Sequence, residues 1–147
     1  MSRVEVDRLF PHPVDRVFLR YTDHAGWTDW AGVGRVYLTR DGSPDPNGKG
    51  AVRAFSSSPG LREEVVRFEP PSLMEYRVIQ GPVPMRDHLG EVRFTPEGSG
   101  TRLSWRVTFR SAIPGLGWLL ERGFTVLFRR MLAGLARDLD RGPRSAG

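Results

Sequence analysis

The chain has 147 residues, of which 39% are hydrophobic and 27% are charged, and it contains no cysteine. This length suits one folding unit around one hydrophobic core, and the absence of cysteine excludes disulfides, thiolate metal ligands and cysteine nucleophiles. The net charge is +5, but the arginines are scattered along the chain among 17 acidic residues. That scatter does not favour a nucleic-acid-binding surface.

No apolar run is long enough to span a membrane or to resemble a secretion signal. We therefore expect a cytoplasmic protein with no membrane span. We also expect one domain over residues 1–141, followed by a flexible tail over residues 142–147, which is rich in glycine, proline and arginine. Nothing in the chain predicts the oligomeric state.

The first part of the chain predicts one strand followed by two short helices. Residues 4–10 alternate between polar and apolar side chains, which is typical of a half-buried strand. Pro13 suits the first turn of a helix. The apolar residues after it recur at helical spacing, at positions Val14, Val17, Phe18 and Tyr21. A second short helix or turn carries Trp27 and Trp30 on one face.

Six further strands are predicted, separated by short segments rich in glycine, proline, aspartate and serine. Such tight connections favour antiparallel hairpins in a meander. The predicted strands cover residues 33–40, 50–56, 61–69, 73–80, 86–96 and 101–110.

The last element is a long amphipathic helix that begins near Pro114. Its apolar stripe consists of Leu116, Leu120, Phe124, Leu127, Met131, Leu135 and Leu139. A stripe of this length has to be buried, and the only large partner available is the sheet. The sequence therefore predicts an α+β fold in which an antiparallel sheet packs against a long C-terminal helix.

Hairpin geometry predicts which side chains share a face, because directly opposed residues in an antiparallel pair point the same way. The expected pairs are Arg53 with Glu64, Glu64 with Val78, Val66 with Tyr76, Phe68 with Met74, Val92 with Trp105, Phe94 with Leu103, and His88 with Phe109. Together they predict a largely aromatic inner face.

A few polar groups fall on that inner face, and two interpretations of each stay open. Arg53 and Glu64 are either a partly solvated ion pair at a cavity mouth or a polar anchor for a ligand. His88 is either a hydrogen-bonded core residue or a proton donor or acceptor, while His12 and His24 look like surface residues. No pair of histidines has the spacing of metal ligands, and no nucleophile elbow or phosphate loop is present. We therefore expect no metal and no cofactor.

The order of these elements resembles one protein family. The matching residues are Pro13-Val14-x-x-Val17-Phe18, Asp23-x-x-x-Trp27-x-x-Trp30, Gly48-x-Gly50-x-x-Arg53, Glu64-Val65, Pro70-Pro71, Tyr76, Gly90, Phe94-x-Pro96 and Gly100-Thr101-Arg102-x-x-Trp105. This pattern is similar to the START-like (SRPBCC) superfamily, in its polyketide cyclase/dehydrase branch. The resemblance implies a helix-grip fold, in which a curved, seven-stranded antiparallel sheet surrounds the long C-terminal helix and two short helices follow the first strand. It also implies a hydrophobic cavity for lipids, polyketides or isoprenoids. The branch shares no catalytic motif, so no catalytic role is carried over.

Three functions stay open, and the first is preferred. The first is binding of a hydrophobic small molecule between the sheet and the last helix. The second is a cyclase or dehydratase that uses Arg53, Glu64, Tyr76 or His88 for acid and base steps. The third is a protein-interaction module. The expected ligand-binding residues are Trp30, Arg53, Phe55, Glu64, Val66, Met74, Tyr76, Val78, His88, Phe94, Trp105, Phe124 and Met131.

Overall fold

The computed structural model describes residues 1–142 and contains seven strands and three helices in that range. In chain order they are β1 (Ser2–Phe10), α1 (Val14–Thr22), α2 (Trp27–Trp30), β2 (Val36–Arg40), β3 (Val52–Phe55), β4 (Arg62–Glu69), β5 (Leu73–Gln80), β6 (Met85–Glu97), β7 (Gly100–Ser111) and α3 (Gly117–Asp140). Apart from Gly142, the tail predicted to be flexible lies outside the described residues.

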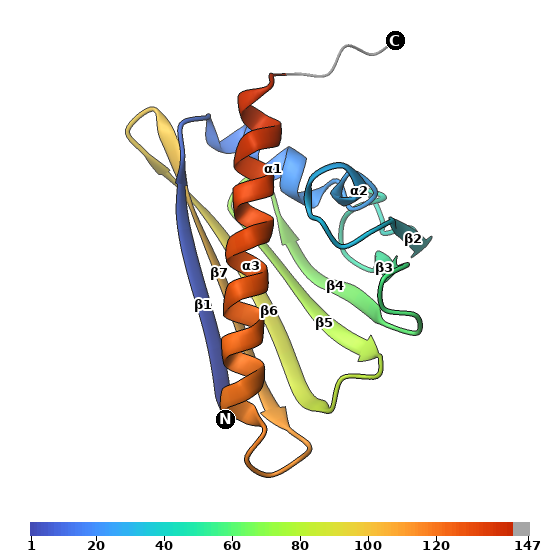
Figure 1. Ribbon diagram of the computed structural model, residues 1–147. Helices are drawn as coiled ribbons and strands as arrows, with labels where there is room; N and C mark the ends of the chain where they lie inside the picture. Colours follow the sequence, from blue (N-terminus) through green and yellow to red (C-terminus); the bar gives the residue numbers. More distant parts are fainter. Residues whose placement is uncertain (143–147) are drawn as a thin grey trace.

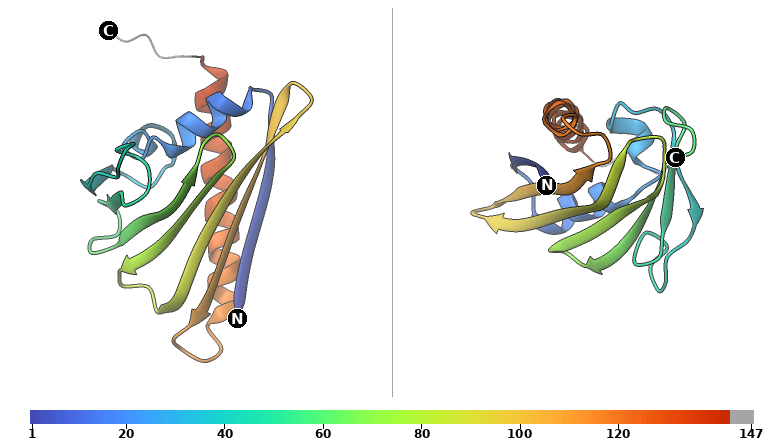
Figure 2. Two further views of the ribbon diagram at one scale, coloured as in Figure 1. Left: turned by 180° about the vertical axis from the view of Figure 1, so that it is seen from behind. Right: turned by 90° about the horizontal axis from the view of Figure 1, so that it is seen from below.

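The strands form a single antiparallel sheet in the order β1-β7-β6-β5-β4-β3-β2. The sheet is strongly curved, and α3 runs along its concave side while α1 and α2 close one end (Figures 1 and 2). The predicted α+β class and helix-grip arrangement are confirmed, including the two short helices after the first strand.

The second half of α3 carries most of the helix's buried surface. Phe128, Met131, Leu132, Leu135 and Leu139 are buried in the same hydrophobic cluster as the inner face of the sheet. The first half is held less closely, and Leu127 of the predicted stripe is 37% exposed. The stripe therefore anchors the helix at one end and leaves room beneath it at the other.

The tight end of the grip is packed with aromatic rings. Tyr21 of α1 makes edge contacts with Trp27, Phe94 and Trp105 at centroid distances of 5.3–5.6 Å. The Trp105 ring stacks on Phe128 of α3 at 4.0 Å. Such rings bury large areas in fixed geometries, so they fix the positions of α1 and α3 against the sheet.

Two of the predicted registers are wrong. In the β3–β4 hairpin Arg53 lies opposite Glu63 and not Glu64, because the last pair, Ala54 with Arg62, encloses an odd number of residues (55–61) where the predicted loop enclosed an even number. In the β4–β5 pair an irregularity between Val65 and Arg67 places Val65 opposite Tyr76 in place of Val66, and Glu63 opposite Val78 in place of Glu64. A bulge adds one residue to a strand and so exchanges its two faces.

Beyond these points the registers hold. Phe68 lies opposite Met74, Val92 opposite Trp105, and Phe94 opposite Leu103, as the hairpins predicted. The exception is in β6, where an irregularity between Arg86 and Leu89 interrupts the pairing, so the predicted pair of His88 with Phe109 is not formed.

A close approach between α3 and α2 yields a test of this packing. A Cβ atom added to Gly134 would lie 2.1 Å from the carbonyl oxygen of Trp30, whereas one added to Gly123, on the same helix, meets nothing within 4 Å. We expect Gly134→Ala to lower the free energy of unfolding by about 1–3 kcal/mol through overpacking. Gly123→Ala, the matched control, should raise it by up to about 1 kcal/mol.

Urea denaturation of both variants measures the two effects. Equal stability of the two alanine variants would contradict the close contact between α2 and α3.

Candidate functional site

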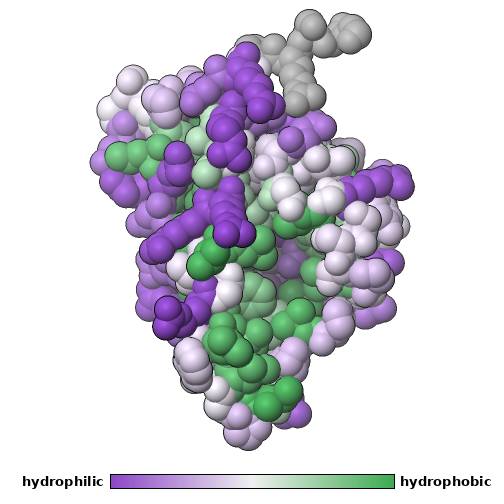
Figure 3. Space-filling model, viewed as in Figure 1, coloured by the Kyte–Doolittle hydropathy of each residue, from purple (hydrophilic) through white to green (hydrophobic). Residues whose placement is uncertain are grey.

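A cavity of about 210 Å³ lies between the inner face of the sheet and the first half of α3. Most of its lining is apolar or aromatic, and a space-filling view shows a hollow beside α3 with hydrophobic residues along its rim (Figure 3). The wide connection between β3 and β4 and the short connection between β5 and β6 contribute the rest of the wall, through Ser57, Ser58, Leu61 and Val83.

The predicted ligand-binding residues divide into three groups. The residues that line the cavity are Arg53, Phe55, Tyr76, Val78, His88, Trp105, Phe124 and Met131. Trp30, Met74 and Phe94 are buried in the hydrophobic core, outside the lining. Glu64 and Val66 do not line it either, because of the register changes in β4.

Glu63 takes the place that the sequence assigned to Glu64. The Glu63 carboxylate lines the cavity and pairs with Arg53, with its Oε1 2.8 Å from Nε and 2.7 Å from a terminal guanidinium nitrogen. Glu64 pairs instead with the exposed side chain of Arg40. Adjacent strand residues point to opposite faces, so a shift of one position decided which of the two acids faces the cavity.

Arg53 is the most deeply buried charged residue at the site, with 1% of its surface exposed. Burial is the largest single effect and lowers the pKa of Arg53, but the charge and hydrogen bond of Glu63, together with the tyrosines Tyr21 and Tyr76, raise the pKa above its ordinary value overall. The guanidinium carbon also lies 4.2 Å from the ring centre of Trp27 and 4.6 Å from that of Tyr76. Two π faces and one carboxylate therefore compensate for the lost hydration.

His24 completes the surroundings of Arg53, and its prediction as a surface residue is wrong. The side chain is fully buried; its Nε2 lies 2.9 Å from the carbonyl oxygen of Asn47, and its Nδ1 lies 3.3 Å from Arg53. Nε2 must donate to that carbonyl, so Nδ1 is left to accept from the guanidinium. Burial and the Arg53 charge lower the pKa of His24 to about 3. The residues next to His24 in the sequence gave no sign of this burial, because it is covered by residues 41–49, which are about twenty positions away in the chain but in direct contact through Asn47.

Tyr76 lies flat across β6 because Gly90 stands opposite it. A Cβ atom at Gly90 would lie 2.3 Å from two atoms of the Tyr76 ring. The Tyr76 hydroxyl accepts a 2.8 Å hydrogen bond from the indole nitrogen of Trp105. Burial raises the pKa of Tyr76 well above its ordinary value, so the hydroxyl keeps its proton and can donate it to a ligand.

His88 enters the cavity from β6, next to Asp87, whose backbone has a positive φ of 53°. Its Nδ1 accepts a 3.1 Å hydrogen bond from the backbone N–H of Val78, which leaves the proton on Nε2. Burial lowers the pKa of His88, with Glu63 and Arg53 acting in opposite directions. The neutral ring lies 5.5 Å from the Tyr76 ring, centre to centre, so two proton donors and one carboxylate face the same space.

Residues 1–142 contain no group of His, Asp or Glu side chains arranged to hold a metal ion. No helix in this range combines the length and hydrophobicity needed to cross a bilayer.

A curved antiparallel sheet closed over a C-terminal helix, with a cavity between them, defines a helix-grip protein of the START-like type. Residues 1–140 match the model of the family described as polyketide cyclase / dehydrase and lipid transport, and the chain belongs to that family. The sequence matches no curated protein.

Solved structures share the fold. A protein from Thermobifida fusca superposes with a TM-score of 0.80 at 20% identity, covering 96% of this chain and 95% of its own. Mll3558 from Rhizobium loti is 30% identical, with a TM-score of 0.64 and coverage of 94% and 96%. CalU16 from Micromonospora echinospora is 17% identical, with a TM-score of 0.66 and coverage of 95% and 79%.

The buried neutral His24 predicts an acid-sensitive fold. Its folded-state pKa of about 3 lies below the ordinary value of 6.5, so the unfolded chain binds the proton first as the pH falls. Stability should therefore decrease from about pH 6.5 downwards, by about 2 kcal/mol at pH 5 from this residue alone. The free energy of unfolding at several pH values measures the loss.

His24→Gln, which keeps a hydrogen-bond donor and an acceptor, should make that pH dependence less steep, and the buried His88, whose pKa is also lowered, should account for part of what remains. An unchanged slope in His24→Gln would show that His24 is protonated in the folded protein.

Proposed function

We propose that the protein binds a small, mainly apolar molecule in this cavity, with one or two oxygen atoms directed at Glu63, Tyr76 and His88. The observation that carries the proposal is an apolar cavity with a compact polar group at one end. Sites for small molecules usually combine an apolar lining with a few well-placed polar groups. The family description, which includes lipid transport, supports the same class of ligand.

The size of the cavity limits the part of the ligand that it holds. A cavity of about 150 Å³ accommodates a benzene molecule, and this one measures about 210 Å³. One ring or two fused rings fit inside, and a longer molecule would extend through the mouth beside α3. Ring-stacking surfaces are provided by Trp105, Phe124 and Phe128.

The polar end favours a ligand that carries a hydroxyl or an enol. Both contacts with Arg53 use Oε1 of Glu63, and Oε2 makes no hydrogen bond with any described residue. Oε2 is therefore an acceptor for a ligand O–H, while Tyr76 and His88 Nε2 are donors for a ligand carbonyl. A hydrogen bond to a charged group contributes about 1.5–3 kcal/mol.

A pair of matched probes tests both parts of the proposal. We expect 2-naphthol to bind at least about tenfold more tightly than naphthalene, since only the former donates to Glu63. Glu63→Gln should remove most of this advantage and leave the affinity for naphthalene nearly unchanged. Glu64→Gln, one residue away on the other face, should preserve it. Fluorescence titration with each probe measures the dissociation constants.

The naphthalene affinity of Glu63→Gln shows whether the cavity itself survives the substitution. Absence of saturable binding of either probe to the wild-type protein would contradict the proposal. Equal affinity for the two probes would contradict the assignment of Glu63.

A second candidate function is proton transfer at a carbon next to a carbonyl, the step that cyclisation and dehydration share. The observation that favours it is that one acceptor carboxylate and two neutral donors line the same cavity. Oε2 of Glu63 would take a proton from the carbon, and Tyr76 or His88 would donate to the carbonyl oxygen that gains charge. The proton returns to carbon when the enol collapses, so the exchange balances without another reactant.

Hydrogen–deuterium exchange of 2-tetralone in D₂O, followed by NMR, detects this step. We expect the wild-type protein to accelerate exchange at the α-carbon, and we expect Glu63→Gln to lower that acceleration by about 10²–10⁴. Glu64→Gln should retain the wild-type rate. If the ketone binds and exchanges no faster than in buffer, the protein is a binding protein and not a catalyst of this step.

A further inference from the structure

Exposed hydrophobic side chains gather at one place on the molecule. Of the nine large hydrophobic residues that are exposed among the described residues, five lie in the loop before α3 and in its first half. These five, here called the apolar rim, are Ile113, Trp118, Leu119, Val126 and Leu127. Trp118 is 61% exposed, which is unusual for so large an apolar side chain.

The apolar rim adjoins the mouth of the cavity. Leu127 belongs both to the rim and to the cavity lining, and Phe124, one turn earlier, also lines the cavity. In the space-filling view hydrophobic surface covers the lower part of α3 and continues around the hollow (Figure 3). The rim and the mouth therefore face the same direction.

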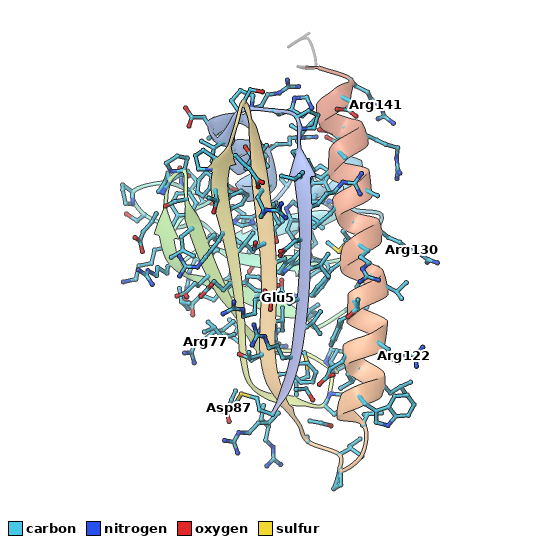
Figure 4. All side chains as sticks on the ribbon, turned by 90° about the vertical axis from the view of Figure 1, so that its left-hand side faces the viewer. Glu5, Arg77, Asp87, Arg122, Arg130 and Arg141 are labelled. Atoms are coloured by element: carbon cyan, nitrogen blue, oxygen red, sulfur yellow. The ribbon has the colours of Figure 1, made fainter. Side chains whose placement is uncertain are left out.

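The charges of this segment are mostly positive. Arg122, Arg129 and Arg130 are exposed, and Figure 4 shows Arg122 and Arg130 projecting from α3 away from the sheet. The only acid between residues 113 and 130 is Glu121, which is half-buried and accepts a hydrogen bond from the backbone N–H of Arg3. A helix face that combines exposed apolar residues with arginines complements a surface that is negatively charged and apolar beneath.

We propose that the first half of α3 docks on an anionic lipid bilayer, with the apolar rim entering the headgroup region and the arginines meeting lipid phosphates. Amphipathic helices with Trp and Leu on one side and arginine near them lie in the bilayer interface in this way. Tryptophan prefers that interface, and each nearby arginine strengthens attraction to anionic lipid. Docking in this orientation places the cavity mouth against the lipid, from which an apolar ligand enters without crossing water.

The experiment uses the ligand-free protein, so its result does not depend on the proposed ligand. Vesicles of phosphatidylcholine alone are compared with vesicles of phosphatidylcholine and phosphatidylglycerol by co-flotation. We expect binding to the anionic vesicles and a shift of tryptophan emission to shorter wavelength. All four tryptophans fluoresce, but the shift on binding reports on Trp118, because Trp27, Trp30 and Trp105 are already buried.

Two variants separate the apolar and the charged contributions. Trp118→Ala combined with Leu119→Ala should weaken binding to anionic vesicles at least about tenfold, since both side chains lose their apolar burial. Arg122→Ala combined with Arg130→Ala should weaken it about fivefold per arginine and reduce the preference for phosphatidylglycerol, with Arg129 still in place. Leu19→Ala, which removes an equally exposed side chain on α1, is the control and should bind like the wild type.

Three results would overturn the proposal. These are no binding of the wild-type protein to anionic vesicles, equal binding by the rim variants and the wild type, and no change in Trp118 emission when the vesicles are bound. Analytical ultracentrifugation without lipid tests whether a second copy of the protein covers the same face. A wild-type dimer that the Trp118 and Leu119 substitutions dissociate would assign the apolar rim to self-association instead.

Discussion

A buried arginine governs the arrangement of the whole site. Transfer of an isolated charge from water to a protein interior costs several kcal/mol even after relaxation, and Arg53 is buried with 1% exposure. Compensation comes from five places in the chain: Glu63 on β4, His24 after α1, Trp27 on α2, and, around the same guanidinium, Tyr76 on β5 and Phe55 on β3. Each of these five side chains must hold its position for the Arg53 charge to stay buried. The guanidinium of Arg53 therefore fixes the arrangement of this part of the cavity wall.

The rest of the fold divides into a tight end and an open end. Near α1 and α2 the aromatic rings pack closely, and Gly134 lets α3 approach the backbone of Trp30. Toward its first residues α3 loses these contacts, and the cavity and the apolar rim both lie there. A helix anchored at one end over a curved sheet therefore produces a binding space and an exposed apolar surface together.

The sequence predicted regular features well and irregular ones poorly. The regular stretch of the β6–β7 hairpin gave the correct partners for Phe94 and Val92, because the period of two holds along an undisturbed part of a strand. The exchange of Glu64 for Glu63 followed from an odd number of residues between the paired Ala54 and Arg62, where an even number was assumed, and from the irregularity after Val65. Neither has a distinct composition, so a period-two pattern could not reveal them.

Local spacing by itself determined the order of the elements, the antiparallel strands, the amphipathic C-terminal helix and the presence of Arg53, Tyr76 and His88 on the inner face. These depend on interactions between near neighbours in the chain, which periodicity and turn residues record. Only the tertiary structure decided that Glu63 faces the cavity, that His24 is buried against Arg53, and that the first half of α3 stays exposed. Those outcomes depend on contacts between residues far apart in sequence, such as His24 with Asn47 and Gly134 with Trp30, which no local pattern encodes.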